Sequence, residues 1–388
     1  MIYLIILIII SAFAVRYDFS FDGKRHENFW YNFVLCVLLA LAGLRYKVGG
    51  DTFAYMEYFK EIPRIWEIKP GDIARAQFEP LWTILVSTSK SIVNDFVFFQ
   101  IIHAAFINIV IFRFIKKNTP YRFTSVLIYY LFFYVDFNTE VMRESLAVCM
   151  FLLAYPHLKT KNWVKYYLFA MLAFLFHGSA IVLFLIPFLS NIKLKAVTAI
   201  SLVGLFLIIT FIPDAIKTLI HIFIFDERIS VRFTRYAGFS ANDNGILAGI
   251  FLHILAPAFI FFFNKRLSNH KPLFRELYFT YWFLAAISVS FAGFSRFLDY
   301  LLPFMAIYFA NTLNEIYRNP VFALCKRMVV VFFMCAAFLP KIMYYFKDKS
   351  NIVRGTKRYS IYYPYYSVFN KQEDYKREEL YYGMFDEN

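Results

Sequence analysis

Long apolar runs alternate with short polar connections along nearly the whole chain, and this alternation limits the folds open to it. A helix needs about 20 apolar residues to cross a bilayer, so 388 residues leave room for about a dozen crossings. The pattern therefore predicts an all-α polytopic integral membrane protein with about 12 transmembrane helices. We place the runs at about 2–15, 29–44, 96–115, 123–137, 141–157, 162–177, 178–190, 194–212, 246–263, 274–292, 296–311 and 326–340.

Composition supports this class. Hydrophobic residues make up 60% of the chain and include 50 phenylalanines, whereas charged residues make up only 18%, against about 25% in soluble proteins. A single water-soluble core cannot bury so much apolar surface. The soluble, disordered and disulfide-scaffold classes are therefore excluded.

The net charge of +14 has a topological explanation. Most Lys and Arg lie in short clusters between apolar runs, as the positive-inside rule requires of cytoplasmic connections, so no nucleic-acid partner is expected. The clusters lie at about 24–26, 116–122, 159–165, 193–195, 265–275 and 318–327. With all of them in the cytoplasm, both termini face outward, provided that the segment 78–93 enters the membrane as a re-entrant segment and returns.

We expect a single transmembrane domain over residues 1–340, with outer loops at about 45–95 and 213–244, and a Tyr-rich polar tail over 341–388. The first outer connection leaves its helix through Arg45 and turns at Gly49 and Gly50 before Asp51. Paired glycines allow positive φ and close backbone approach, so this turn would present Arg45 and Asp51 to one cavity. The alternative is an ordinary loop in which Asp51 caps the next helix.

Two further motifs place charge on the outer side. Glu79 introduces the re-entrant segment, where a carboxylate needs a partner or water; alternatively, it favours the helix dipole. In DFNTEVMRESLA, residues 136–147, Thr139 is predicted to cap the next helix. Arg143, one turn inside the membrane, is expected to face the bundle interior or an aqueous cavity. A local ion pair with Glu140, three residues earlier, is the alternative.

His177 lies between two very apolar half-segments. Its side chain suits proton transfer at neutral pH, although a lone intramembrane histidine also serves as an interhelical hydrogen-bonding group. Arg296 and Asp299 begin a later apolar run and stand three residues apart, so they either belong to the same outer site or neutralise each other.

The longest outer loop carries Arg228, Arg232 and Arg235 at spacings of four and three, which place them on one helix face. Such a stripe would grip a phosphate or an acidic sugar, and an interfacial amphipathic face is the alternative. Tyr55 is expected to bind substrate as well, because aromatic rings suit sugar faces. Together these residues predict a lipid-linked, phosphate-bearing, glycosidic substrate.

Five motifs, in order, resemble a known family. GLRYKVGGDTFAYMEYF, FEPLW, VMRESLA, FHGSA and SRFLDY are similar to the EpsG family of Wzy-type bacterial polysaccharide polymerases, from the first apolar run to about residue 310. The family more typically has Gly-Thr-Asp in the first motif, where this chain has Gly49-Gly50-Asp51-Thr52. The resemblance implies a GT-C-like glycosyltransferase that joins repeat units carried on undecaprenyl diphosphate at the outer face of the bacterial cytoplasmic membrane, for capsule, exopolysaccharide or O-antigen.

The resemblance also implies the site residues, which are Arg45, Asp51, Glu79, Arg143, His177 and Arg296. In the expected mechanism the three arginines neutralise the departing diphosphate. His177 is the preferred base for the acceptor hydroxyl, with Glu79 or Asp51 second. No compact acidic cluster predicts a metal, and no cofactor is expected.

The partners expected are the undecaprenyl-diphosphate-linked donor and acceptor glycans, membrane lipid, and chain-length regulator and flippase proteins. Two alternatives remain open at this point. One is a flippase or exporter of lipid-linked oligosaccharide, for which a path open to both faces is typical. The other is a membrane acyltransferase that modifies polysaccharide, with His177 as its base.

Overall fold

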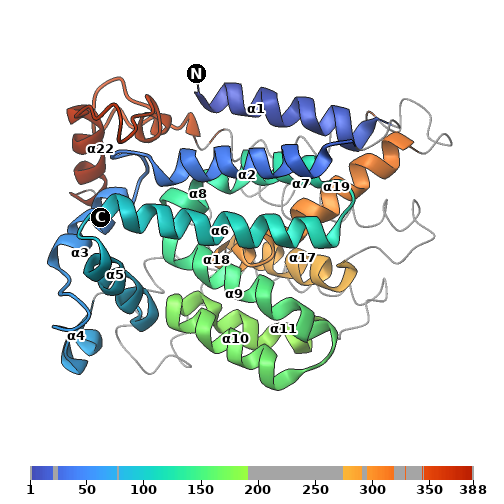
Figure 1. Cartoon of the computed structure of the whole chain (residues 1–388), viewed down its shortest axis with the longest axis horizontal. Helices are drawn as coiled ribbons and strands as arrows, with labels where there is room; N and C mark the ends of the chain where they lie inside the picture. Colours follow the sequence, from blue (N-terminus) through green and yellow to red (C-terminus); the bar gives the residue numbers. More distant parts are fainter. Residues whose placement is uncertain are drawn as a thin grey trace. The chain divides into compact units, whose positions relative to one another are not determined.

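The computed structural model describes residues 2–20, 25–76, 78–190, 274–290, 295–318, 328, 343 and 345–386 (Figure 1). Every named element in these ranges is a helix, so the predicted all-helical class is confirmed there. The chain forms two compact units, of which the first is Met1–Ile181 with Leu339–Asn388 and the second is Val182–Phe338. The C-terminal tail thus belongs to the same unit as the first half of the chain.

The first unit contains α1 (Ile2–Phe13), the π-helix η1 (Ala14–Phe19), α2 (Glu27–Gly43), α3 (Thr52–Glu61), α4 (Pro70–Arg75), α5 (Pro80–Ile92), α6 (Phe96–Asn118), α7 (Arg122–Phe132), α8 (Tyr134–Thr139), α9 (Met142–Lys159), α10 (Trp163–Phe176), η2 (Gly178–Ile181), η5 (Arg358–Ile361) and α22 (Tyr375–Asp386). The second unit contains α11 (Val182–Ser190), α17 (Arg275–Ser290), α18 (Ser295–Asp299) and α19 (Leu302–Arg318). Side-chain caps mark two of the starts: Asp95 accepts from the Val97 amide before α6, and Asn162 accepts from the Lys165 amide before α10.

Helices α2 and α6 pack closely and run in opposite directions. Near the start of α2, the Tyr31 hydroxyl donates to the carbonyl of Phe112, 2.8 Å away near the end of α6. At the other end of α2, a Cβ on Gly43 would lie 3.2 Å from the Ile101 backbone. A small residue at this point therefore lets the two backbones approach.

Helix α9 runs parallel to α6, and α10 returns beside α9. His103 Nε2 lies 2.9 Å from the Met142 carbonyl at the start of α9, and the rings of Phe114 and Tyr155 meet 5.9 Å apart near the ends of both helices. A turn at residues 160–162 then reverses the chain into α10. The starts of α6 and α9 and the ends of α2 and α10 consequently lie at one end of the unit.

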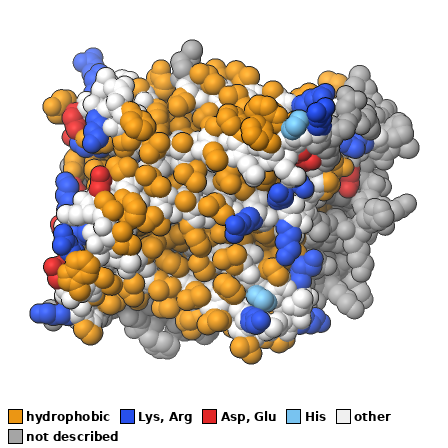
Figure 2. Space-filling model, viewed as in Figure 1, with side chains coloured by type: hydrophobic (Ala, Val, Ile, Leu, Met, Phe, Trp, Pro, Cys, Tyr) orange, Lys and Arg blue, Asp and Glu red, His pale blue; other side chains and the backbone are white. Residues whose placement is uncertain are grey.

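The two ends of this bundle differ in charge. The basic end gathers the start of α2, the ends of α6 and α9 and the start of α10, with Arg25, Lys116, Lys117, Lys159, Lys161 and Lys165. We call the opposite end, where the motifs with Arg45, Glu79, Arg143 and His177 lie, the motif end. Figure 2 shows hydrophobic side chains over the middle of α1, α2 and α6 and charged side chains toward the helix ends.

Helix α5 begins and ends at the motif end. Glu79, just before its first residue, contacts Arg143 at the start of α9, and only three residues separate its last residue, Ile92, from the start of α6. Its 13 residues span about 20 Å, too short for a bilayer. Both ends of α5 thus lie at the motif end, whereas entry of the segment 78–93 into the membrane stays a prediction.

Exposed apolar helix faces indicate that the first unit lies in a lipid membrane. On α10, the side chains of Val164, Leu168 and Met171 are 82%, 59% and 48% exposed, whereas a soluble helix turns polar residues outward. By length and composition, Ile2–Phe19 and Phe96–Asn118 could cross a membrane, and four shorter helices in the described ranges are apolar.

The C-terminal tail folds onto the loop that follows α2. The Tyr46 amide donates to the Tyr366 carbonyl and the Val368 amide to the Leu44 carbonyl, both at 2.9 Å. Buried Arg377 donates to the Lys47 carbonyl at 3.0 Å, and also to the carbonyls of Ser360 and Pro364. Val353, Ile361, Tyr362 and Leu380 form a small hydrophobic core within the tail. Polar composition did not predict this packing.

Candidate functional site

An ion pair between Arg143 and Glu79 forms the centre of the motif end. Arg143 stands on the first turn of α9, and Glu79 occupies the N-cap position of α5. Their side chains are 21% and 26% exposed, respectively, so the pair is partly open to a ligand. Glu140, the local partner that the spacing allowed, lies 3.7 Å from Arg358 of the tail.

Aromatic rings support the Arg143 guanidinium. Its central carbon lies 4.3 Å from the centroid of the Phe78 ring, in cation–π geometry. Tyr55 is a further hydrogen-bond partner of Arg143, and its own ring packs 5.0 Å from Trp82. Arg143 Nε is buried and has no hydrogen-bond partner in the part of the chain that is described. Phe78, Tyr55 and Glu79 thus hold the guanidinium in place.

His177 lies beside this pair, where α10 ends. The chain leaves the helix in extended conformation at His177, and the next amide, that of Gly178, donates to Glu79 Oε1 at 3.1 Å. Glu79 therefore links α9 with the break after α10. The structure brings Glu79, Arg143 and His177 together, although these residues are widely separated in sequence.

Arg45 is buried below the motif end, with 1% of its surface exposed. Its guanidinium donates to the carbonyls of Val48 and Ala42, and its Nη2 lies 3.6 Å from the sulfur of Met142. Gln100 donates to the Arg45 carbonyl at 3.1 Å. These bonds hold the end of α2 against the start of α9, where Arg143 follows Met142.

Gly49 has the positive φ, +115°, that the paired glycines were expected to allow, whereas a cavity shared by Arg45 and Asp51 stays a prediction. A Cβ at Gly49 would lie 2.4 Å from Cβ of Thr139, so the turn packs tightly against the residues that precede α9. Asp51 occupies the N-cap position of α3, as the alternative interpretation expected, but its side chain makes no capping hydrogen bond. The predicted cap by Thr139 is wrong, because its hydroxyl donates to the Val135 carbonyl and α9 begins at Met142.

Two further groups of residues were predicted to belong to the site. Arg296 and Asp299 both lie in α18 of the second unit. Arg228, Arg232 and Arg235 fall outside the described residues.

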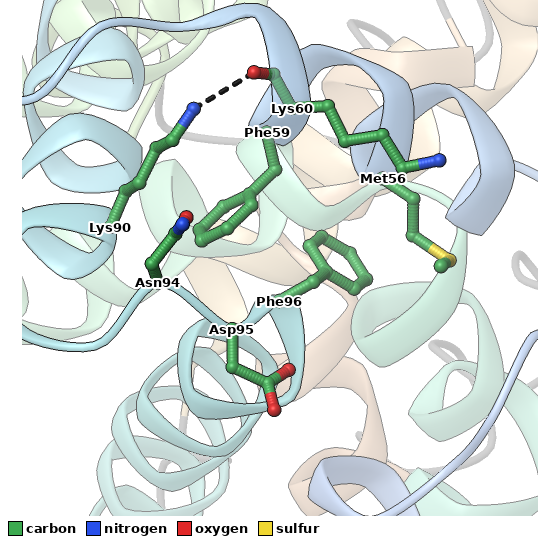
Figure 3. Close-up of a pocket in the computed structure, with 7 residues that line it drawn as sticks. All are labelled: Met56, Phe59, Lys60, Lys90, Asn94, Asp95 and Phe96. Atoms are coloured by element: carbon green, nitrogen blue, oxygen red, sulfur yellow. Dashed lines mark hydrogen bonds between the residues drawn. The ribbon is translucent and has the colours of Figure 1, made fainter.

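A cavity of about 380 Å³ opens beside the start of α6 (Figure 3). It is lined by Met56, Phe59, Lys60, Lys90, Asn94, Asp95 and Phe96. Lys90 donates to the carbonyls of Lys60 and Ile62 at 2.8 and 2.7 Å, so its ammonium already joins α5 to the residues at the end of α3. None of the predicted site residues lines this cavity.

Glu144 and Ser179 were not among the predicted site residues, yet they adjoin the site. Glu144 is 1% exposed, and the Ser179 hydroxyl lies 2.9 Å from its Oε1 and 2.6 Å from His177 Nδ1. Both residues stand inside the motifs VMRESLA and FHGSA, one and two positions from Arg143 and His177. Helix periodicity alone could not predict this contact, because it joins Glu144 on α9 to Ser179 in the break after α10.

The helices of the described residues, with their apolar faces, and the charged motif end are those of a membrane protein. A family model for the EpsG family matches residues 28–367, nearly the whole length. The chain belongs to the EpsG family, and this membership indicates a polysaccharide polymerase-type role in polysaccharide biosynthesis. Neither the curated proteins nor the solved structures gave a match to the chain.

Proposed function

We propose that this protein is a glycosyltransferase that joins undecaprenyl-diphosphate-linked oligosaccharide repeat units. The motif end would face outward from the bacterial cytoplasmic membrane, because basic connections favour the cytoplasm. About 12 spans and a GT-C-like architecture belong to the same proposal. The observation that carries it is the partly exposed Arg143–Glu79 pair beside His177, at the end of the bundle opposite the basic connections.

Arg143 is proposed to hold the diphosphate of the donor. A guanidinium fork matches two phosphate oxygens, and the Phe78 ring fixes the plane of the fork. In the structure the Glu79 carboxylate occupies the position on Arg143 where a phosphate group of the donor would bind. A diphosphate carries more negative charge than one carboxylate, so the donor would displace Glu79 from Arg143.

In the proposed step, the acceptor hydroxyl oxygen attacks the anomeric carbon of the donor. The new glycosidic C–O bond forms as the bond to the diphosphate oxygen breaks, and the diphosphate leaves with the electron pair. Arg143 stabilises the charge that develops on it, and the hydroxyl proton passes to His177. Arg296, and the stripe of Arg228, Arg232 and Arg235, are proposed as further contacts of the lipid diphosphate.

The remaining predicted residues receive supporting roles. Buried Arg45 would add positive charge to the site and hold the first motif in place. Tyr55 would keep Arg143 in position. Asp51, with Glu79, remains the second choice of base. Donor and acceptor glycans, membrane lipid, a flippase and a chain-length regulator are the proposed partners.

The test uses the purified full chain in lipid nanodiscs with one synthetic undecaprenyl diphosphate repeat unit. We expect the wild-type chain to form dimeric and longer glycans and Arg143→Ala to form none. The matched control is Arg122→Ala, because Arg122 also forms an ion pair, with Glu27 at 3.5 Å, but at the basic end. Full polymer from Arg143→Ala would contradict the assignment.

The same assay separates the alternatives. A flippase would move single repeat units between leaflets of the bilayer without joining them. An acyltransferase would leave glycan length unchanged while adding an ester. Longer glycans from the purified wild-type chain are expected only of a polymerase.

A further inference from the structure

His177 is the first of three side chains joined in a line. His177 Nδ1 lies 2.6 Å from Ser179 Oγ, and this hydroxyl lies 2.9 Å from Glu144 Oε1. Glu144 is buried at the start of α9, with 1% of its surface exposed. The line therefore runs from the end of α10 through η2 into α9.

Donor and acceptor roles in this line follow from chemistry. A carboxylate only accepts hydrogen bonds, so the Ser179 hydroxyl donates a hydrogen bond to Glu144. The oxygen of that hydroxyl can then accept a hydrogen bond from a protonated His177 Nδ1. The backbone N–H of Ser179 also points at Nδ1, at 3.3 Å, and can donate to this nitrogen only when it carries no proton. The two contacts at Nδ1 therefore compete, and the 2.6 Å contact with the hydroxyl is the shorter. The short contact thus favours the tautomer with a proton on Nδ1.

We propose that Ser179 and Glu144 are positioning residues for His177. They hold the ring so that Nδ1 carries the proton and Nε2 accepts the proton of the acceptor hydroxyl. When Nε2 takes up that proton, Nδ1–H of the imidazolium still donates its hydrogen bond to Ser179. The negative charge of Glu144 then stabilises the imidazolium through the serine. This inference rests on the proposed function, in which His177 is the base.

The local fold explains why this arrangement is held. The chain is extended at His177 and then enters the 3-10 turn η2, so Ser179 folds back toward the ring that precedes it. Glu79, which accepts from the Gly178 amide, holds the same turn from the other side. Two carboxylates, from α9 and from the start of α5, thus fix the conformation of residues 177–179.

A double-mutant cycle in the nanodisc polymerisation assay tests the inference. We expect Ser179→Ala to lower kcat about 10- to 100-fold, with KM little changed, as loss of an orienting partner does in comparable sites. Ser179→Thr, which keeps the hydroxyl, should retain most of kcat. In the His177→Ala background, Ser179→Ala should cause no further loss, because a residue that acts through another loses its effect when that residue is absent.

Ser125→Ala is the matched control, since Ser125 is a fully buried serine that donates to the Tyr121 carbonyl at the start of α7. This variant should keep wild-type kcat. Multiplicative losses in the cycle, or unchanged kcat in Ser179→Ala, would overturn the positioning role while polymerisation by the wild-type chain leaves the proposed function standing.

A second measurement needs no activity. Nitrogen NMR of the chain labelled with ¹⁵N-histidine, with the His177 signals assigned through His177→Ala, should show Nδ1 protonated in the wild-type chain. Glu144→Gln and Ser179→Ala should shift the tautomer balance toward a proton on Nε2. A wild-type His177 that carries its proton on Nε2 would overturn the inference, whatever reaction the protein catalyses.

Discussion

Arg143 forms an ion pair with Glu79, which lies 64 positions earlier in the chain. A partner three residues from Arg143 was available in Glu140, but that carboxylate faces the tail. The long-range pair joins α9 to the start of α5, and through Gly178 it reaches the end of α10. Three segments that carry separate motifs therefore meet at one charged group.

Replacing Arg143 with lysine is expected to abolish most activity even though the charge is retained. An ammonium lacks the planar fork that grips two phosphate oxygens and stacks on Phe78. Loss of one group that stabilises developing charge costs about 100- to 1,000-fold in kcat. Initial rates of glycan elongation measure this, with Arg122→Lys at the basic end as control. Equal rates for Arg143→Lys and the wild-type chain would rule out a bidentate role.

Gly49→Ala is expected to destabilise the first motif. Its φ of +115° strains any L residue, at a cost of about 1–3 kcal/mol, and the new methyl would press on Thr139 at 2.4 Å. The melting temperature of the purified chain should therefore fall. Gly71→Ala is the control, because a Cβ there meets no atom within 4 Å. The prediction fails if both variants melt at the wild-type temperature.

Arg377→Ala is expected to release the tail from the motif end. The substitution leaves three carbonyl groups, of Lys47, Ser360 and Pro364, without their donor. We expect a loss of about 2–5 kcal/mol in tail docking. Limited chymotrypsin digestion measures this as faster cleavage within residues 345–386. Arg354→Ala, at an exposed tail position, should leave the cleavage rate unchanged.

Tail docking is also expected to weaken in acid. Hydrogen bonds from Lys47 and Tyr46 hold the pKa of Glu373 below its usual value of 4.5. A carboxyl with a lowered pKa stabilises the folded state fully above that usual value, and the contribution is lost as pH falls through the lowered pKa. Chymotrypsin is inactive there, so pepsin digestion or hydrogen exchange below about pH 4.5 serves as the measurement. Glu373→Gln should remove this part of the acid response.

The contribution of Lys47 to tail docking is expected to depend on pH in the opposite direction. Burial lowers the pKa of Lys47, but its hydrogen bonds to Glu373 and Glu378 outweigh burial and raise the pKa above 10.5. A raised lysine pKa gives stability that is complete below the usual value and is lost only as pH rises through the folded value. Hydrogen exchange in the tail should therefore show no contribution from this contact to pH dependence between about pH 5 and 10. A Lys47-dependent change at neutral pH would contradict the ion-pair assignment.

The amino-acid sequence by itself determined the apolar helices, the basic connections and the charged motifs, because hydrophobic length and charge are properties of short segments. It also predicted the turn at Gly49, since positive φ is a local requirement. The helical class and the family followed from these features. Residues 78–93 were predicted to return without crossing, and the structure has α5 starting and ending at the motif end.

Only the tertiary structure decided which charges meet. Arg143 forms an ion pair with Glu79, Arg45 is buried against Met142, and the tail packs on the loop after α2. Each outcome depends on contacts between segments far apart in the chain, whose free energies compete with local pairs of similar strength. Spacing along one helix cannot rank these contacts, because the choice depends on which helix ends pack side by side.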